Sequence, residues 1–324
     1  MIFSIFILFL FTIFIHQGNK SIISSGFDLT KVEFLKSLLP YGIMIAHCHI
    51  YEDFEIAAKY IVGLFLFCSG YGLMYKKKKS QLFFKNFLLS SKKLLFPLIV
   101  PIIIYFVVYI IYKDHSIYSF FKKSLKFQVI LPYTWFILTL LILRLVFYLA
   151  NIIKNNIFFY AVYTCGVLIS MVVLKILNVG AWTYLSNISF VTGSIICHLE
   201  DKKNIINIFS SSKWIMYLFL FFLLLFISYL SYTDIPGISY FNIPLYCICI
   251  YSVLSLWPKI FSITITVISK ISYELYLYQS VAFLLLPSDL INFNNFIYLI
   301  ALLLLTTILA YLGYKLNKLL LKAC

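Results

Sequence analysis

The chain has 324 residues, of which 63% are hydrophobic, 19% are aromatic and only 11% are charged. A soluble domain carries roughly 25% charged residues, so this sequence lacks the polar surface that a water-soluble globule needs. The composition excludes a soluble enzyme, a disordered segment and a disulfide-rich secreted module. It predicts an integral membrane protein built from many helices.

The net charge of +15 comes almost entirely from lysine, because Arg144 is the only arginine. In a chain this apolar, the charge indicates membrane topology and contact with anionic membrane lipid, so we expect no nucleic acid partner. The 7 cysteines lie in or beside apolar runs or at the C-terminus, and no pair has the spacing of a zinc site. We therefore expect free thiols and no metal.

Apolar runs give the expected helices. The first run, residues 1–15, is shorter than the roughly 20 residues of a membrane span and lacks the features of a secretory signal. It predicts a marginal extra helix within residues 1–16. Ten stronger segments follow, at residues 33–50, 57–75, 94–112, 130–150, 157–177, 181–197, 214–232, 239–257, 262–286 and 295–314. We expect an all-α fold, a polytopic bundle of about 10 to 11 membrane-spanning helices, forming one integral membrane domain over residues 1–324.

The distribution of lysine predicts the orientation of this bundle. Residues 76–93 form an expected loop with seven lysines, which places it in the cytoplasm together with the C-terminus. If successive helices cross the membrane in alternating directions, the acidic residues 52–55 lie outside. The lysines within residues 113–126 then also lie outside, which the positive-inside rule disfavours. We predict a multi-pass protein of the plasma membrane.

Ionisable residues at membrane depth are costly, and His47 is the foremost example. Lys36 precedes it by eleven positions. Eleven residues at 100° each return to within about 20° of the same helix face, roughly 16 Å further along the axis. Such a helix can anchor a long anionic donor at Lys36 and carry out proton chemistry at His47. Pro40 leaves the Lys36 carbonyl without its helical partner, which can open the helix at that mouth.

Four further stretches contain polar or aromatic residues in apolar surroundings. They are Phe65 to Tyr71, which ends in Ser-Gly-Tyr; Lys92 and Lys93 before Pro97; the pair Trp135 and Phe136; and Ser269 to Gln279, which contains Tyr273, Glu274 and Tyr276. Small residues such as those of Ser-Gly-Tyr also let membrane helices approach closely, so packing is the alternative interpretation of that stretch.

Taken in order with Lys36 and His47, these stretches resemble the membrane-bound acyltransferase family 3, which contains the sugar and polysaccharide O-acetyltransferases. The resemblance covers about residues 28 to 315. Two positions depart from the family pattern, since Lys36 stands where arginine is usual and Gln279 where many relatives have histidine.

The resemblance implies transfer of an acyl group, usually acetyl, from cytoplasmic acyl-CoA to a hydroxyl of a cell-envelope glycan or lipid-linked sugar. Acetyl-CoA is then a co-substrate, and we expect no tightly bound cofactor. The implied catalytic residues are His47 and Lys36. The implied donor-binding residues are Lys85, Lys92 and Lys93. The residues implied to bind the acceptor or line a tunnel are Ser69, Tyr71, Trp135, Tyr273, Glu274 and Tyr276.

Two other classes of membrane protein stay open at this point. A polysaccharide polymerase or flippase is also helical and basic, but a polymerase commonly has a large outer loop, and the longest expected here is about 17 residues. A secondary transporter needs paired ionisable residues at the membrane midplane, where Glu274 is the only acidic candidate.

Overall fold

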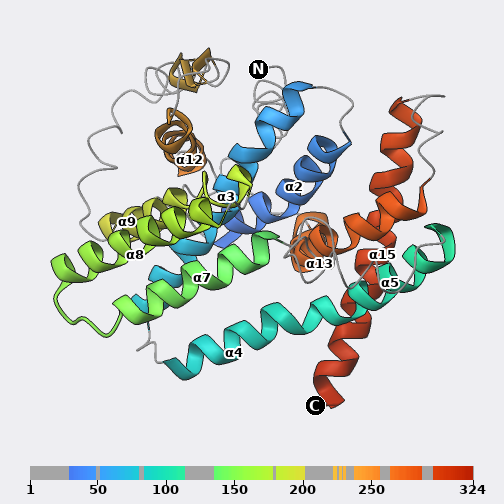
Figure 1. Cartoon of the computed structure of the whole chain (residues 1–324), viewed down its shortest axis with the longest axis horizontal. Helices are drawn as coiled ribbons and strands as arrows, with labels where there is room; N and C mark the ends of the chain where they lie inside the picture. The colour runs from blue at the N-terminus through green and yellow to red at the C-terminus, as the bar shows by residue number, and fades with distance from the viewer. Residues whose placement is uncertain are drawn as a thin grey trace.

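In the computed structural model, the described residues are 29–48, 52–79, 84–113, 135–177, 180–200, 222–224, 226–227, 229–230, 237–255, 263–286 and 295–323. Every regular element among them is helical (Figure 1). The elements are α2 (Leu29–His47), α3 (Glu52–Lys79), α4 (Phe84–Leu95), η1 (Phe96–Leu98), α5 (Ile99–Lys113), α7 (Trp135–Ala150), α8 (Asn156–Ile176), η2 (Ala181–Thr183), α9 (Ile188–Glu200), α12 (Ser239–Ser255), α13 (Ile263–Leu285) and α15 (Asn295–Ala323). The predicted all-α class is confirmed.

Four stretches among the described residues are long and apolar enough to cross a membrane. They are Ala57–Lys79, Asn86–Ile111, Asn156–Ile176 and Asn295–Leu320. The second joins α4, η1 and α5 into one nearly continuous rod, because Pro97 tightens a single turn without ending the helix (Figure 1). Beyond Lys93, the exposed residues of this stretch, such as Ile103 and Ile111, are apolar, as expected of a surface that faces lipid.

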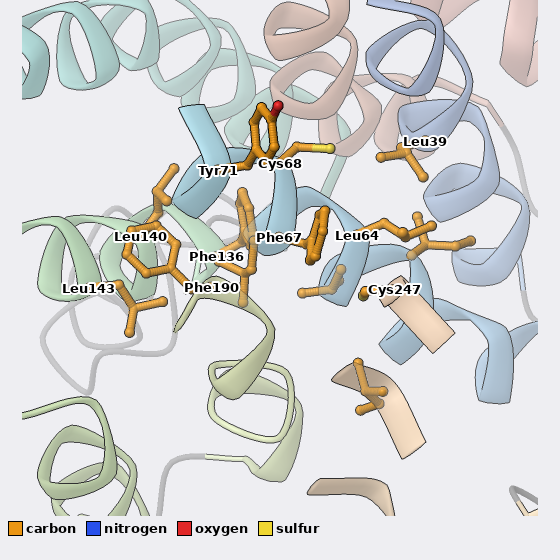
Figure 2. Close-up of a cluster of buried hydrophobic side chains, with 14 of the residues drawn as sticks. Leu39, Leu64, Phe67, Cys68, Tyr71, Phe136, Leu140, Leu143, Phe190 and Cys247 are labelled. Carbon is orange, nitrogen blue, oxygen red and sulfur yellow. The ribbon is translucent and has the colours of Figure 1, made fainter. Parts of the chain in front are cut away.

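The core is built around α3. Figure 2 shows its residues Leu64, Phe67, Cys68 and Tyr71 among side chains from the neighbouring helices. Those neighbours include Leu39 of α2, Phe136, Leu140 and Leu143 of α7, Phe190 of α9 and Cys247 of α12. Because these buried side chains come from segments far apart in sequence, α3 joins α2, α7, α9 and α12 into one bundle.

Glycines bring α3 and α9 into unusually close contact. A Cβ atom on Gly70 would lie 1.9 Å from the carbonyl oxygen of Phe190, and one on Gly193 would lie 2.1 Å from that of Phe67. Ser194 of α9 donates a hydrogen bond to the Gly70 carbonyl oxygen at 3.0 Å. Small residues allow such an approach between membrane helices. Gly70 of the Ser-Gly-Tyr stretch therefore has a packing role.

Several boundaries differ from the sequence-based prediction. Residues 76–79 continue α3, and residues 84–93 already belong to α4, so most of the expected loop at 76–93 is helical. Lysine is a good helix former, and its long side chain reaches water from a helix end, so the helices continue through the charged residues. The expected segment 181–197 is broken into η2 and α9, with Thr183 donating to the Gly180 carbonyl at 2.8 Å. The expected helix at 1–15, most of segment 214–232 and the loop after Lys113 lie outside the described residues.

Candidate active site

Helix α2 carries both residues of the predicted catalytic pair. It is one helix from Leu29 to His47 with Pro40 inside it. Lys36 is exposed, whereas His47 is half-buried at the last position, with its Nδ1 atom enclosed by protein. The helix thus places the exposed cation near its middle and the half-buried imidazole at its last position, roughly 16 Å apart along its axis.

Helix α13 runs alongside α2 in the same direction. Tyr41 of α2 packs near Ile271 and Leu275, and Cys48, directly after His47, packs near Ala282. Gln279 lies between these two levels of α13. Its side chain is fully buried, and both amide atoms lack a hydrogen-bond partner in the part of the chain that the structure describes. A buried, unpaired amide is costly, so this position is suited to a polar ligand.

Aromatic rings join three of the stretches identified in the sequence. The ring of Phe136 lies 5.8 Å from that of Phe65 on α3 and 5.5 Å from that of Tyr276 on α13. Trp135, at the start of α7, packs edge-on against Phe136 at 6.2 Å. Residues separated by more than 200 positions thus form one aromatic cluster, which consists of Phe65, Trp135, Phe136 and Tyr276.

The hydroxyl of Tyr71 has a partner away from that aromatic cluster. Tyr71 is buried and donates to the Glu200 carboxylate at 2.5 Å, and Tyr251 of α12 donates to the same carboxylate. Ser69, two positions earlier, is half-buried. The Glu200 carboxylate therefore links α3, α9 and α12, and it gives the Tyr71 hydroxyl a structural partner.

The remaining predicted tunnel residues lie on α13. Tyr273 is half-buried and donates to the Leu94 carbonyl oxygen at 2.5 Å, which ties α13 to the end of α4. Glu274 is buried and faces Asn317 of α15. These two neighbouring side chains therefore point to different helices, and only Tyr273 approaches the lysine-rich end of α4.

Four cations from four helices converge at one end of the bundle. Lys76 of α3 is close enough to Arg144 of α7, Lys36 of α2 and Lys93 of α4 for their charges to repel. We call these four residues the cationic cluster. The three lysines are exposed and Arg144 is half-buried. Such a set of positive charges at an accessible surface attracts anions.

The other predicted donor-binding lysines lie on α4 with Lys93. Lys92 is exposed. Lys85 lies in the first turn of the same helix, and its side chain is outside the described part. The structure thus places Lys36 and Lys93 in the same cluster. The sequence assigns both to the site but does not predict that they lie close together.

Two lysines at the end of α3 have structural contacts instead. The ammonium of Lys77 lies 3.3 Å from the centroid of the Phe159 ring on α8. Lys78 donates to the carbonyl oxygen of Cys197 in the last turn of α9, where a cation is favourable. The run Lys76–Lys79 therefore contributes only Lys76 to the cationic cluster.

Sequence reasoning missed Arg144 as a member of a site and did not single out Lys76 from the other lysines of residues 76–93. Arg144 carried a usable signal, because a charged residue inside the apolar segment 130–150 is a functional candidate by default. Lys76 carried none, since four consecutive lysines are alike in sequence. Among the described residues, no group of three or more His, Cys, Asp or Glu side chains has a geometry that would hold a metal ion.

The apolar helical bundle and its family relationship together define a membrane acyltransferase. The chain belongs to acyltransferase family 3, since the model of that family, described as an acyltransferase domain, matches residues 6–315. This confirms the family expected from the motifs and extends the match to the N-terminal apolar run. Neither the curated proteins nor the solved structures contain a match to the chain.

Proposed function

We propose that the protein transfers an acetyl or similar acyl group from cytoplasmic acyl-CoA to a hydroxyl of a cell-surface glycan or lipid-linked sugar. One observation carries the proposal beyond the family assignment. Helix α2 presents Lys36 within the cationic cluster and His47 at its last position, so one helix connects an anion-attracting surface to a proton acceptor.

The cationic cluster suits the donor. Coenzyme A carries its phosphates at one end and its thioester at the other, so a donor extended along α2 reaches from the cluster toward His47. The exposed lysines attract the phosphates, and lysine-rich ends of membrane helices face the cytoplasm, where acyl-CoA is made. A location in the plasma membrane, with several membrane crossings, follows from the same reasoning.

His47 suits the chemistry of transfer. A sugar hydroxyl is a weak nucleophile and needs a base whose pKa lies near neutrality, as that of imidazole does. The hydroxyl oxygen attacks the thioester carbon while neutral His47 accepts the hydroxyl proton. The C–S bond then breaks, the acyl group stays on the sugar oxygen, and the imidazolium returns the proton to the departing thiolate. In the alternative two-step route, an enzyme nucleophile first takes the acyl group and the thiol leaves; the sugar hydroxyl then attacks the acyl-enzyme, and the nucleophile is released.

The aromatic cluster suits the acceptor. Half-buried Trp135 has a flat face with a polar edge, which is the kind of surface that the apolar faces of sugar rings stack on, and buried Tyr276 supports it through the Phe136 ring. The cluster belongs to helices α3, α7 and α13 and therefore joins the two helices that pack against α2. A glycan on this surface would lie near the middle of the bundle, between the helices that hold the proposed site.

The test is transfer of label from acetyl-CoA in membranes that contain the protein. His47→Ala should lower the rate at least about 10²-fold, the usual contribution of a general base, at equal membrane abundance. His198→Ala is the matched control. His198 lies on α9, where its ring packs 5.4 Å from that of Tyr160 on α8, so it does not belong to α2. Equal activity of the two variants would contradict the role of His47, and no labelled glycan with the unmodified protein would contradict the proposed reaction.

A further inference from the structure

Arg144 is a half-buried cation, and the described residues around it contain little that balances its charge. It is the only arginine in the chain, and its Nε atom is enclosed without a hydrogen-bond partner among the described residues. The titratable groups that act on it in the described part are Tyr148, Tyr273 and the like-charged Lys76, and no carboxylate is among them. A guanidinium cannot lose its proton in a protein, so it needs an acceptor when it is buried.

A second donor without a hydrogen-bond partner among the described residues lies on α4 at the same level as Arg144. Helices α4 and α7 run side by side in opposite directions (Figure 1), and the ring of Phe87 packs on that of Tyr148 at 5.4 Å. Ser91 lies one turn after Phe87, and Arg144 lies one turn before Tyr148, so both reach the same level of the α4–α7 contact. The Ser91 hydroxyl is also enclosed without a hydrogen-bond partner in the described part of the chain.

The surroundings of these two donors are positive and accessible. Lys36, Lys76 and Lys93 complete the cationic cluster, and all three side chains are exposed. Tyr273 closes the inner side through its hydrogen bond to the Leu94 carbonyl. A half-buried guanidinium behind a rim of mobile ammonium groups is the arrangement in which an anion gains both directed hydrogen bonds and charge neutralisation.

We propose that Arg144 and Ser91 form the phosphate-binding centre of the cationic cluster, with the guanidinium holding two phosphate oxygens and the serine hydroxyl a third. The ligand is a phosphate or diphosphate group of the acyl donor, so this proposal rests on the proposed function. Arginine suits this position better than lysine, because its planar fork matches two oxygens at once. An anionic lipid headgroup offers the same chemistry and is the other source that the experiment must distinguish.

The first experiment measures binding of coenzyme A and of inorganic pyrophosphate to the full chain, purified in neutral detergent. Arg144→Gln should weaken both at least roughly tenfold, as expected for loss of a charged hydrogen bond, and Arg144→Lys should recover only part of this. Lys154→Gln is the matched control, because it removes one exposed positive charge in the turn between α7 and α8 and should leave binding within about twofold.

A neighbouring pair of serines keeps the proposal testable if the arginine variants fold poorly. Ser91→Ala should weaken binding of pyrophosphate several-fold. Ser90→Ala should not, because the Ser90 hydroxyl already donates to the Phe87 carbonyl oxygen at 2.9 Å. Equal affinity of the Ser91→Ala and Ser90→Ala proteins would overturn the assignment of Ser91 to the site.

The outcomes separate this proposal from the proposed function. Pyrophosphate binding that depends on Arg144, without binding of coenzyme A, would support the phosphate centre and refute the donor. Acyl transfer with unchanged phosphate affinity in Arg144→Gln would refute the phosphate centre alone. In nanodiscs with and without phosphatidylglycerol, competition of that lipid with pyrophosphate at Arg144 would identify the headgroup as the source and overturn the assignment to the donor.

Discussion

The contact between α3 and α9 predicts that one added methyl group is costly at Gly70 or Gly193 and harmless at Gly72. At the first two positions the new Cβ would lie 1.9 Å and 2.1 Å from backbone carbonyl oxygens, whereas at Gly72 no atom lies within 4 Å. Backbone atoms cannot rotate away, so the helices must separate by about 1.5 Å to restore normal contact.

The magnitude follows from two effects of that separation. Forcing extra volume into a packed interface costs about 1–3 kcal/mol, and weakening the Ser194 hydrogen bond to the Gly70 carbonyl adds about 1 kcal/mol. We therefore expect Gly70→Ala and Gly193→Ala each to lower the free energy of unfolding by roughly 2–4 kcal/mol. Gly72→Ala should leave it unchanged or raise it slightly, because alanine is the better helix former.

The assay is unfolding of the purified protein in mixed micelles with increasing denaturing detergent, followed by helical circular dichroism. The double variant Gly70→Ala, Gly193→Ala should cost less than the two single changes added together, because both open the same contact. Equal stability of the Gly70→Ala and Gly72→Ala proteins would refute the reasoning. Loss of activity in folded Gly70→Ala protein would show that the Ser-Gly-Tyr stretch does more than pack.

Three further predictions concern the site and the orientation. Lys36→Gln should raise the apparent KM for acyl-CoA several-fold and leave the KM for the acceptor unchanged. Steady-state kinetics with each substrate varied in turn measure both values, and a rise in the acceptor KM alone would contradict the donor role. Tyr71→Phe should lower the free energy of unfolding by about 1–3 kcal/mol, because it removes the hydrogen bond to Glu200. Activity per folded molecule should be unchanged, and a selective loss of activity would instead favour a role in acceptor binding. In intact cells, a cysteine introduced at Ser80 should add no labelling by a membrane-impermeant thiol reagent to that of the native chain. Ready labelling of this cysteine would reverse the predicted orientation.

The helices were predictable because each needs a long apolar run, and such runs are visible in sequence. Their ends were less predictable. Lys76 to Lys79 look like a loop by charge, yet they extend α3, because a helix end lets long lysine side chains reach solvent or the Phe159 ring. The break before α9 depends on local hydrogen bonds of Thr183, which hydropathy does not encode.

The candidate site was predictable only along single helices. The spacing of Lys36 and His47 places both on α2, since helical periodicity requires no tertiary information. The cationic cluster depends on how α2, α3, α4 and α7 pack, and no pattern within one segment specifies that Lys76 rather than Lys77 faces Arg144. The partner of Tyr71, Glu200, lies 129 positions away in sequence and could not be inferred from the Ser-Gly-Tyr stretch.

In the contact between α3 and α9, a glycine of each helix packs against a backbone carbonyl of the other. This close contact also bears on which parts of the enzyme are able to move. The Phe67 and Phe190 carbonyls occupy the spaces that Gly193 and Gly70 leave open. Sliding either helix would push these carbonyls against residues that have side chains, so we expect the pair to behave as one rigid body. Helix α2 is different, because Pro40 removes one of its internal hydrogen bonds and weakens it at mid-length. We therefore expect a displacement that admits substrates to involve α2, with its histidine, and not a change within the α3–α9 pair.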